Sequence, residues 1–183
     1  MGMFFNTFFR HADVVKMANL AQMVNVIAPM MTNKQGMFLQ PTFFPIAEYS
    51  KQRGNVALSA HVASPEYTLS AQGGRGGQGQ GPQISYLDVS STFNPQEKTV
   101  FVNVLNRSKD KDIATSVECQ EGKLGTSVEV WQMNHPDLKA THTFGDDQKV
   151  VPSTKTMQAQ VANNALRYTF PAHSLTILKL KVD

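Results

Sequence analysis

The first third of the chain alternates apolar runs with short polar breaks. Residues 14–21 form a nearly continuous apolar run with β-branched side chains, which favours a buried strand, although a continued helix has the same pattern. Residues 32–36 are typical of a turn. Residues 45–54 predict a helix, with proline in its first turn and glycine at its end. A further helix is predicted over residues 3–11, where four phenylalanines recur at helical spacing: Phe4, Phe5, Phe8 and Phe9.

After residue 54 the pattern changes to short runs that alternate or are β-branched, with turn residues between them. Such runs without intervening helices indicate an antiparallel β-sandwich. In the run at residues 99–105, Val100, Val102 and Val104 share one face. The opposite face is mixed, because it carries both polar and apolar side chains. The boundary between the two parts therefore falls near residues 54–56. The predicted strands cover residues 56–58, 84–89, 99–105, 127–131 and 175–182.

A glycine-rich stretch at residues 72–82 interrupts the sandwich pattern. Chains of this composition gain little from burial, so we expect a flexible loop. Residues 74–79 match a G-x-G-x-x-G string, but a dinucleotide site requires that string to follow a strand and to open a helix. Here Pro82 and a predicted strand follow instead, which argues against a nucleotide cofactor.

Composition describes a globular protein of 183 residues, 41% hydrophobic and 17% charged. The formal charge of +3 is scattered along the chain and predicts neither a nucleic-acid nor a membrane partner. The apolar run at residues 17–31 is too short to span a bilayer, and no secretory pattern precedes it. The single cysteine, Cys119, excludes an internal disulfide. Location stays open from sequence, with the cytoplasm favoured over secretion.

Residues for metal binding or catalysis are not clustered. The five histidines show no ligand spacing, so we expect no metal and no cofactor. A G-x-S-x-G nucleophile motif is absent from the sequence, and the carboxylates are scattered over turns and strand faces.

Amides inside the apolar run are the most informative feature. Asn19, Gln22 and Asn25 recur every three residues within residues 10–29. Buried amides are costly unless each is hydrogen-bonded. The pattern therefore predicts either a structural network or a polar ligand site.

Residues 10–29, together with 37–45, resemble the last strand of the catalytic barrel in α-L-arabinofuranosidases of glycoside hydrolase family 51. The resemblance is dense over the first third of the chain and thinner afterwards. It implies a mostly β chain in two parts. Residues 1–54 would be the last helix–strand–helix of a (β/α)8 barrel, and residues 55–183 an antiparallel, jelly-roll-like C-terminal sandwich.

The resemblance also implies where the chemistry lies. Retaining glycosidases use two carboxyl groups about 5 Å apart. In the resembled family these glutamates lie on earlier barrel strands, and the acid/base follows an asparagine. The chain contains no Asn-Glu pair, so we expect no catalytic residue in it and no activity from it alone.

Gln22 matches the glutamine that contacts arabinose in the cleavage subsite of the resembled family. At the mouth of a barrel strand, its amide could both donate to and accept from a sugar hydroxyl. Capping of a backbone turn is the alternative, and Asn19 and Asn25 are expected to be structural. An apolar loop is predicted after this strand, either as core filling or as lining of the sugar site. Its residues are Met23, Met30, Met31, Met37 and Phe38.

The whole enzyme would remove terminal α-L-arabinofuranosyl residues from arabinan or arabinoxylan. Its partner would be an arabinose-containing polysaccharide or oligosaccharide, and the exposed phenylalanines of residues 1–53 would favour a homo-oligomer. The sandwich would fold without residues 1–53. An alternative function is a non-catalytic carbohydrate-binding or structural sandwich. Its candidate sugar-contacting aromatic residues, which could equally be core, are Tyr67, Tyr86, Trp131 and Tyr168.

Overall fold

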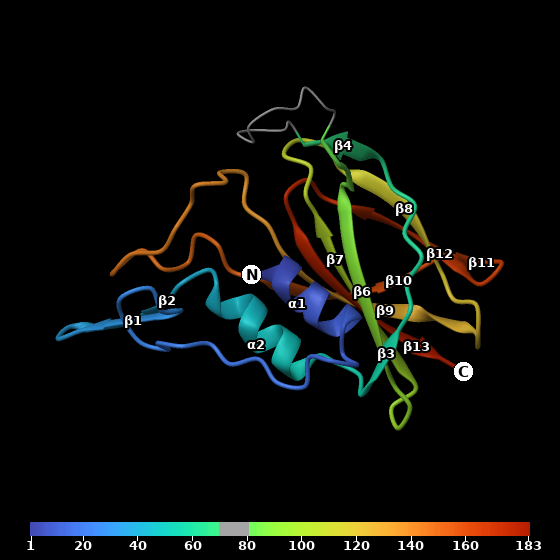
Figure 1. Ribbon diagram of the computed structural model, residues 1–183, viewed down its shortest axis with the longest axis horizontal. Helices are drawn as coiled ribbons and strands as arrows, with labels where there is room; N and C mark the ends of the chain where they lie inside the picture. Colours follow the sequence, from blue (N-terminus) through green and yellow to red (C-terminus); the bar gives the residue numbers. More distant parts are fainter. Residues whose placement is uncertain (70–80) are drawn as a thin grey trace.

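The computed structural model describes residues 1–69 and 81–183 and is mostly β, with two helices. Helices α1 (Gly2–Arg10) and α2 (Phe43–Lys51) lie in the first third of the chain (Figure 1). All paired strands are antiparallel, as the sequence predicts for a sandwich. The strands are β1 (Met30–Asn33), β2 (Gly36–Leu39), β3 (Val56–Leu58), β4 (Glu66–Thr68), β5 (Gln83–Ser85), β6 (Leu87–Asn94), β7 (Thr99–Asn106), β8 (Ile113–Glu118), β9 (Leu124–Met133), β10 (Ser153–Gln158), β11 (Val161–Ala162), β12 (Ala165–Phe170) and β13 (Leu175–Val182).

The main sheet has six strands in the order β10-β9-β13-β7-β6-β3. The last strand, β13, lies at its centre and pairs with β7 on one side and β9 on the other. Leu178 faces both Val102 and Val130 across these pairs. The valine face predicted for β7 packs in the main core, as the alternation requires.

A three-stranded sheet, β11-β12-β8, covers one face of the main sheet. Alternate residues of β12 point into the space between the two sheets: Leu166, Tyr168 and Phe170 are buried there. They meet valines and leucines from β7, β9 and β13 in one continuous cluster. This cluster is the core of the sandwich.

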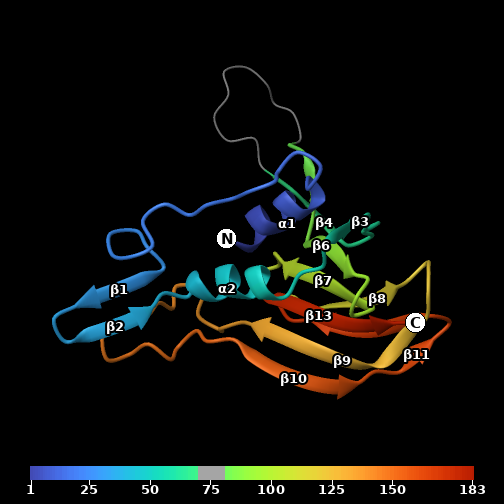
Figure 2. The same ribbon diagram turned by 90° about the horizontal axis from the view of Figure 1, so that it is seen from below.

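The two helices cover the opposite face of the main sheet (Figure 2). A second core lies between helices and sheet. It contains Tyr49 of α2 and Trp131, Leu175 and Ile177 of the sheet, with Phe5, Phe9 and Phe44 packed against them. Gly2 begins α1 so close to the sheet that a Cβ atom there would lie 3.3 Å from the Leu175 side chain. The molecule therefore has three layers, with one core on each side of the main sheet.

The strand predicted at residues 14–21 does not form, although the helices predicted on either side of it do. Residues 15–20 are irregular, and Val14 and Met17 are 72% and 78% exposed. A strand receives its hydrogen bonds from neighbouring strands, and no described residue pairs with 14–21. The predicted turn at residues 32–36 is confirmed as the end of the β1–β2 hairpin, which replaces the apolar loop expected there.

Among the predicted strands, residues 56–58 and 175–182 match β3 and β13, and residues 99–105 and 127–131 lie within β7 and β9. Residues 84–89 divide at Tyr86 between β5 and β6. Outside the hairpin, five strands lie in none of the predicted ranges: β4, β8, β10, β11 and β12. The serines, threonines and charges of β8 and β10 carry little apolar signal. Most of the predicted flexible loop at 72–82 lies outside the described residues. Within residues 1–69 and 81–183, neither helix has the length and hydropathy needed to cross a bilayer.

Candidate functional site

The segment that carries Gln22 is irregular and exposed. Gln22, Asn25 and Val26 have positive φ angles of 57°, 60° and 58°. A β-branched residue rarely adopts this conformation, because its branched side chain crowds the backbone. Asn19 and Gln22 are exposed and Asn25 is half-buried, so the three amides do not share a buried face. The predicted buried amide face is therefore wrong for this chain.

Asn25 holds the segment to the hairpin, which agrees with its expected structural role. Its Nδ2 donates to Thr32 Oγ1 at 3.0 Å, and its Oδ1 accepts from the Thr32 amide at 2.7 Å. The Asn25 amide also donates to the Met30 carbonyl at 2.8 Å. These bonds fix the chain just after Gln22, whereas Gln22 itself stays at the surface.

Apolar side chains on either side of Gln22 are exposed as well. Ile27 is 86% exposed, and further exposed residues occur along the stretch between α1 and β1. Figure 2 shows the path of this stretch as a long connection without helix or strand. Contiguous apolar surface on a soluble protein marks a place where other protein or a ligand packs. The exposed large residues of this stretch are Val14, Met17, Leu20, Met23, Val24, Val26 and Ile27.

An open hollow of about 360 Å³ lies at the end of this segment. Three parts of the chain meet there: residues 26–28, residues 40–42 before α2, and Ala140 and Thr141 of the loop after β9. Thr141 Oγ1 lies 3.4 Å from Gln40 Oε1, across the hollow's two sides. The loop of the sandwich thus reaches the segment that carries Gln22.

Buried His142 fixes this loop. Its Nε2 accepts from the Val150 amide at 2.9 Å, and its Nδ1 lies 2.6 Å from the Leu39 carbonyl oxygen. A carbonyl only accepts, so the proton is on Nδ1 and the ring is neutral. His142 therefore ties β2 of the hairpin to the loop after β9.

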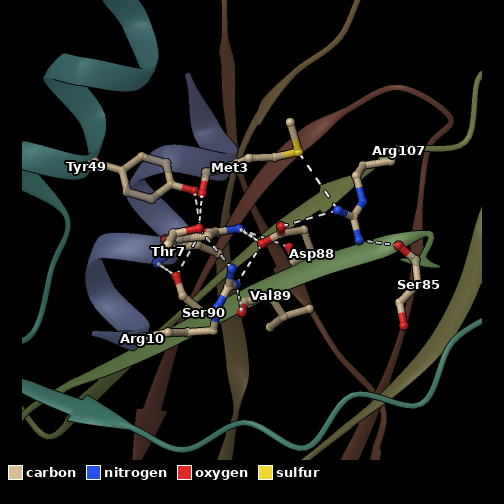
Figure 3. A network of polar contacts seen from close by, with 11 residues as sticks. Met3, Thr7, Arg10, Tyr49, Ser85, Asp88, Val89, Ser90 and Arg107 are labelled. Carbon is tan, nitrogen blue, oxygen red and sulfur yellow. Dashed lines mark hydrogen bonds and ion pairs between the residues drawn. The ribbon is translucent and has the colours of Figure 1, made fainter. Parts of the chain in front are cut away.

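The most extensive polar network lies elsewhere, between α1 and the main sheet (Figure 3). Asn6 is fully buried at its centre. Its Oδ1 accepts from Tyr49 Oη at 2.7 Å and from Ser90 Oγ at 2.8 Å. Ser90 Oγ in turn accepts from Asn103 Nδ2 at 3.1 Å. Asn103 belongs to the mixed face of β7, which was the sequence signal for this network.

Asp88 carries the charge of the network. Arg10 Nη1 lies 2.7 Å from Asp88 Oδ1, and Arg107 Nη1 lies 3.6 Å from Oδ2. Arg10 also donates to the Val89 carbonyl at 2.7 Å, and Arg107 donates to the Ser85 carbonyl. Two arginines thus compensate one buried carboxylate, which is costly to bury alone. Figure 3 shows both guanidinium groups converging on it.

The role of this network is to hold the fold together. Burial raises the pKa of Tyr49 far above its ordinary value, so its hydroxyl stays protonated and donates to Asn6. The groups in contact donate and accept hydrogen bonds, but no nucleophile–base pair is among them. Asn6 could not be recognised from sequence, because it lies among phenylalanines in an apolar helix. The network clamps α1 to the sandwich.

Metal and acid–base candidates are few. Within the described ranges, no group of three or more His, Cys, Asp or Glu side chains could hold a metal ion. Desolvation by burial raises the pKa of the Glu48 carboxyl, and nearby Glu129 raises it further. Gln52 Nε2 donates to Glu129 Oε1 at 3.2 Å, between α2 and the sheet. This pair lies at a packing interface.

The aromatic candidates for sugar binding are mostly core residues. Trp131 and Tyr168 are buried, each in one of the two cores. Tyr67 and Tyr86 are half-buried and stack on each other, with ring centroids 4.9 Å apart. An exposed aromatic platform of the kind common in sugar-binding sandwiches is therefore not formed by these four residues.

Comparison with known proteins identifies a family that the chain matches. A family model described as the α-L-arabinofuranosidase C-terminal domain matches residues 1–174. A probable α-L-arabinofuranosidase C of Aspergillus niger is 33% identical over 100% of this chain and 34% of its own length. The intracellular exo-α-(1→5)-L-arabinofuranosidase 1 of Bacillus subtilis is 30% identical over 96% of this chain and 33% of its own length. The chain therefore spans about a third of the length of these curated relatives.

Solved structures agree in fold. The arabinofuranosidase of glycoside hydrolase family 51 from Xanthomonas axonopodis pv. citri superposes with a TM-score of 0.79 at 28% identity, covering 96% of this chain and 33% of that one. The α-L-arabinofuranosidase of Thermotoga maritima, in its arabinose complex, gives a TM-score of 0.79 at 20% identity. It covers 97% of this chain and 37% of that one.

Proposed function

The chain belongs to the α-L-arabinofuranosidases of glycoside hydrolase family 51, as their C-terminal domain, and on this premise we propose that it acts as part of a retaining enzyme. The whole protein removes terminal α-L-arabinofuranosyl residues from arabinan or arabinoxylan. The observation that carries the proposal is the family match over residues 1–174, together with the shared fold. Its partner is an arabinose-containing polysaccharide or oligosaccharide.

In this proposal, residues 14–21 complete the catalytic barrel as a strand in the whole protein. The exposed apolar side chains of the segment support this, because barrel neighbours would bury them. The same neighbours would supply the backbone hydrogen bonds that a strand needs. Residues 1–54 then form the end of the barrel and residues 55–183 the sandwich.

Gln22 contacts the sugar in this arrangement. Its amide offers both a donor and an acceptor to hydroxyl groups. Gln22 is exposed, and residues 26–28, which follow it in the chain, line the hollow that the sandwich loop also reaches. The carboxyl pair of a retaining mechanism comes from the rest of the protein. The neighbouring Glu48 and Glu129 lie instead between α2 and the sheet, at a packing contact.

The whole protein with Gln22→Ala tests this role, with Gln35→Ala in the hairpin turn as the control. A hydrogen bond that strengthens in the transition state is worth about 1–3 kcal/mol, so kcat/KM on an aryl α-L-arabinofuranoside should fall roughly 10–100-fold. Gln35→Ala should retain full activity, and both variants should keep the parent Tm. Unchanged kcat/KM in Gln22→Ala would show that Gln22 does not contact the reacting sugar.

Residues 1–183 alone should not hydrolyse the same substrate. The proposal that the catalytic carboxyl pair lies in the rest of the protein would be overturned if the pure chain hydrolysed the substrate and lost this activity on replacement of one of its own carboxylates. Addition of the purified remainder of the protein is the positive arm, since activity should require both parts.

Self-association is part of the proposal as well. Phe4 of α1 is 65% exposed, and the large apolar residues on both sides of Gln22 are exposed as well. We expect residues 1–183 to form dimers or larger species at micromolar concentration, measured by light scattering after gel filtration. Met17→Ser combined with Ile27→Ser should shift the population toward monomer, whereas Lys34→Ser should not.

A further inference from the structure

A second hollow, of about 250 Å³, lies at the end of the sandwich where β7 and β9 finish and β13 begins. Three connections form it: the β7–β8 turn, the start of the long loop after β9, and the β12–β13 turn. No residue of the hollow belongs to the Gln22 segment or to the buried network. Its lining consists of Asp112, Asn134, His135, Pro136, Ala172 and His173.

His173 is held in one orientation. Its φ angle is +42°, which few residues other than glycine and asparagine adopt. Its amide donates to the Ser108 carbonyl at 2.7 Å, and its Nδ1 lies 2.6 Å from the Lys109 carbonyl oxygen. Since that oxygen only accepts, Nδ1 donates to it, and Nε2 is the ring's remaining polar atom.

Asp112 and Asn134 are fixed through Ala172. Asp112 Oδ1 accepts from the Ala172 amide at 2.8 Å, and Asn134 Nδ2 donates to the Ala172 carbonyl at 3.2 Å. Each of these two side chains therefore has one polar atom hydrogen-bonded to the backbone and a second atom, an oxygen, that can accept from a ligand. His135 likewise places Nδ1 against the Asp137 backbone, 3.1 Å from both its amide nitrogen and its carbonyl oxygen. This leaves Nε2 as its second polar atom.

The hollow is therefore rich in acceptors. The second oxygens of Asp112 and Asn134 accept, and Nε2 of His173 is a further polar atom, so a ligand with several hydroxyl groups, each of which can donate and accept, matches them. An anion would be repelled by Asp112. A metal ion is disfavoured because these side chains do not form a group of three metal-ligating residues within the described part of the chain. The volume is below the roughly 300–1,000 Å³ of sites for drug-sized ligands, which suits one sugar ring.

We propose that this hollow binds a single pentose unit of an arabinose-containing glycan, through hydrogen bonds to Asp112, Asn134 and His173. The identity of the glycan rests on the proposed function. Asn134 and His135 open the same loop whose Thr141 lines the hollow beside the Gln22 segment. One loop of the sandwich would thus hold a glycan chain at this hollow and also reach the segment that carries Gln22.

Titration of the 183-residue chain with α-1,5-linked L-arabinotriose, followed by amide NMR, tests the proposal. The expected result is a saturable shift of the amide resonances of the five lining residues other than Pro136, which has no backbone N–H. His173→Asn keeps a residue type that tolerates positive φ and an amide that can donate to Lys109, but removes the ring Nε2. Asp112→Asn keeps the acceptor for Ala172 and changes the second oxygen to a donor. Each variant should weaken binding by about tenfold or more.

Asp110→Asn, in the same turn but outside the hollow, and His61→Asn, at an exposed site, are the controls and should bind as the parent does. If His173→Asn alters the spectrum globally, Asp112→Asn carries the test. The proposal is overturned if no lining resonance shifts, if the shifts centre on Tyr67 and Tyr86, or if Zn²⁺ binds the hollow and arabinotriose does not. Hydrolysis of an aryl arabinofuranoside by the whole protein is measured separately. If the whole protein hydrolyses this substrate but arabinotriose does not bind the hollow, the inference about the hollow is wrong and the proposed function stands.

Discussion

Asn6 of α1 and Asp88 of β6, 82 positions apart in the sequence, are joined by two hydrogen bonds from one amide. Asn6 Nδ2 donates to the backbone carbonyl and to Oδ1 of Asp88, at 3.0 Å each. The first bond fixes the helix to the strand backbone, and the second orients the carboxylate toward Arg10 and Arg107. The contact makes a helix from the predicted barrel end an integral part of the sandwich.

Asn6→Ala should destabilise the chain by about 3 kcal/mol. The substitution removes the hydrogen-bond partner of the Tyr49 hydroxyl, the Ser90 hydroxyl and the Asp88 carboxylate, all of which are buried. Each unsatisfied buried group costs roughly 1–3 kcal/mol. Urea unfolding of the 183-residue chain measures this loss. Asn19→Ala, at an exposed position, should change stability by less than about 0.5 kcal/mol. A loss under about 1 kcal/mol for Asn6→Ala would mean that the network does not hold α1.

Glu48→Gln should stabilise the chain at neutral pH. Burial raises the pKa of the Glu48 carboxyl above its ordinary 4.5, and its Oε1 is buried without a hydrogen-bond partner among the described residues. Because the folded state holds this proton more tightly than the unfolded state, wild-type stability falls as pH rises through the unfolded and then the folded pKa. The variant lacks this loss.

Thermal unfolding between pH 3.5 and 7 measures the effect. The Tm of Glu48→Gln should exceed that of the parent at pH 7, and the two should converge below about pH 4, where the carboxyl is protonated in both states. Glu121→Gln, in an exposed turn, should follow the parent. A variant that is less stable than the parent at pH 7 would contradict the desolvation argument.

His142→Ala should loosen the β1–β2 hairpin without unfolding the sandwich. The ring accepts from Val150 and contacts the Leu39 carbonyl, so its removal leaves two backbone groups without their partner. Hydrogen exchange should accelerate for Met30–Asn33 and Gly36–Leu39 and stay unchanged in β7 and β13. His61→Ala is the control. Equal acceleration throughout the main sheet would show that His142 supports the whole fold.

Removal of residues 1–54 tests the predicted boundary. Sequence alone predicts that the sandwich folds without them, but the structure packs Tyr49 against Trp131 and Ile177 and buries Asn103 beneath α1. We therefore expect residues 55–183 to have a lower Tm than 1–183 and to bind a dye that reports exposed apolar surface. Equal Tm and no dye binding would show that the helices contribute little to the sandwich.

The sequence by itself determined the two helices and several apolar strands such as β7 and β13, but not β12. The phenylalanines of α1 recur at helical spacing, and α2 has its proline in the first turn, although the helix ends at Lys51, before the predicted stop at Gly54. A helix makes its hydrogen bonds within its own segment, so local sequence is enough to specify it. The strong alternation of Val100, Val102 and Val104, and the apolar run of β13, similarly mark strands whose burial the residues themselves require. The residues at 10–29 and 37–45 were enough to indicate the family.

Only the tertiary structure decided which apolar runs become strands and which polar residues become core. Residues 14–21 have a strand composition and are exposed, whereas the polar β10 is a strand because β9 pairs with it. Strand hydrogen bonds come from other segments, so composition cannot assign a strand whose partners are not specified by the same stretch. Asn6 is buried for the same reason: Asp88, Ser90 and Tyr49 satisfy it, and they come from distant parts of the chain. Local patterns specify what a segment can bury, and the folded neighbours decide whether its polar atoms are satisfied there.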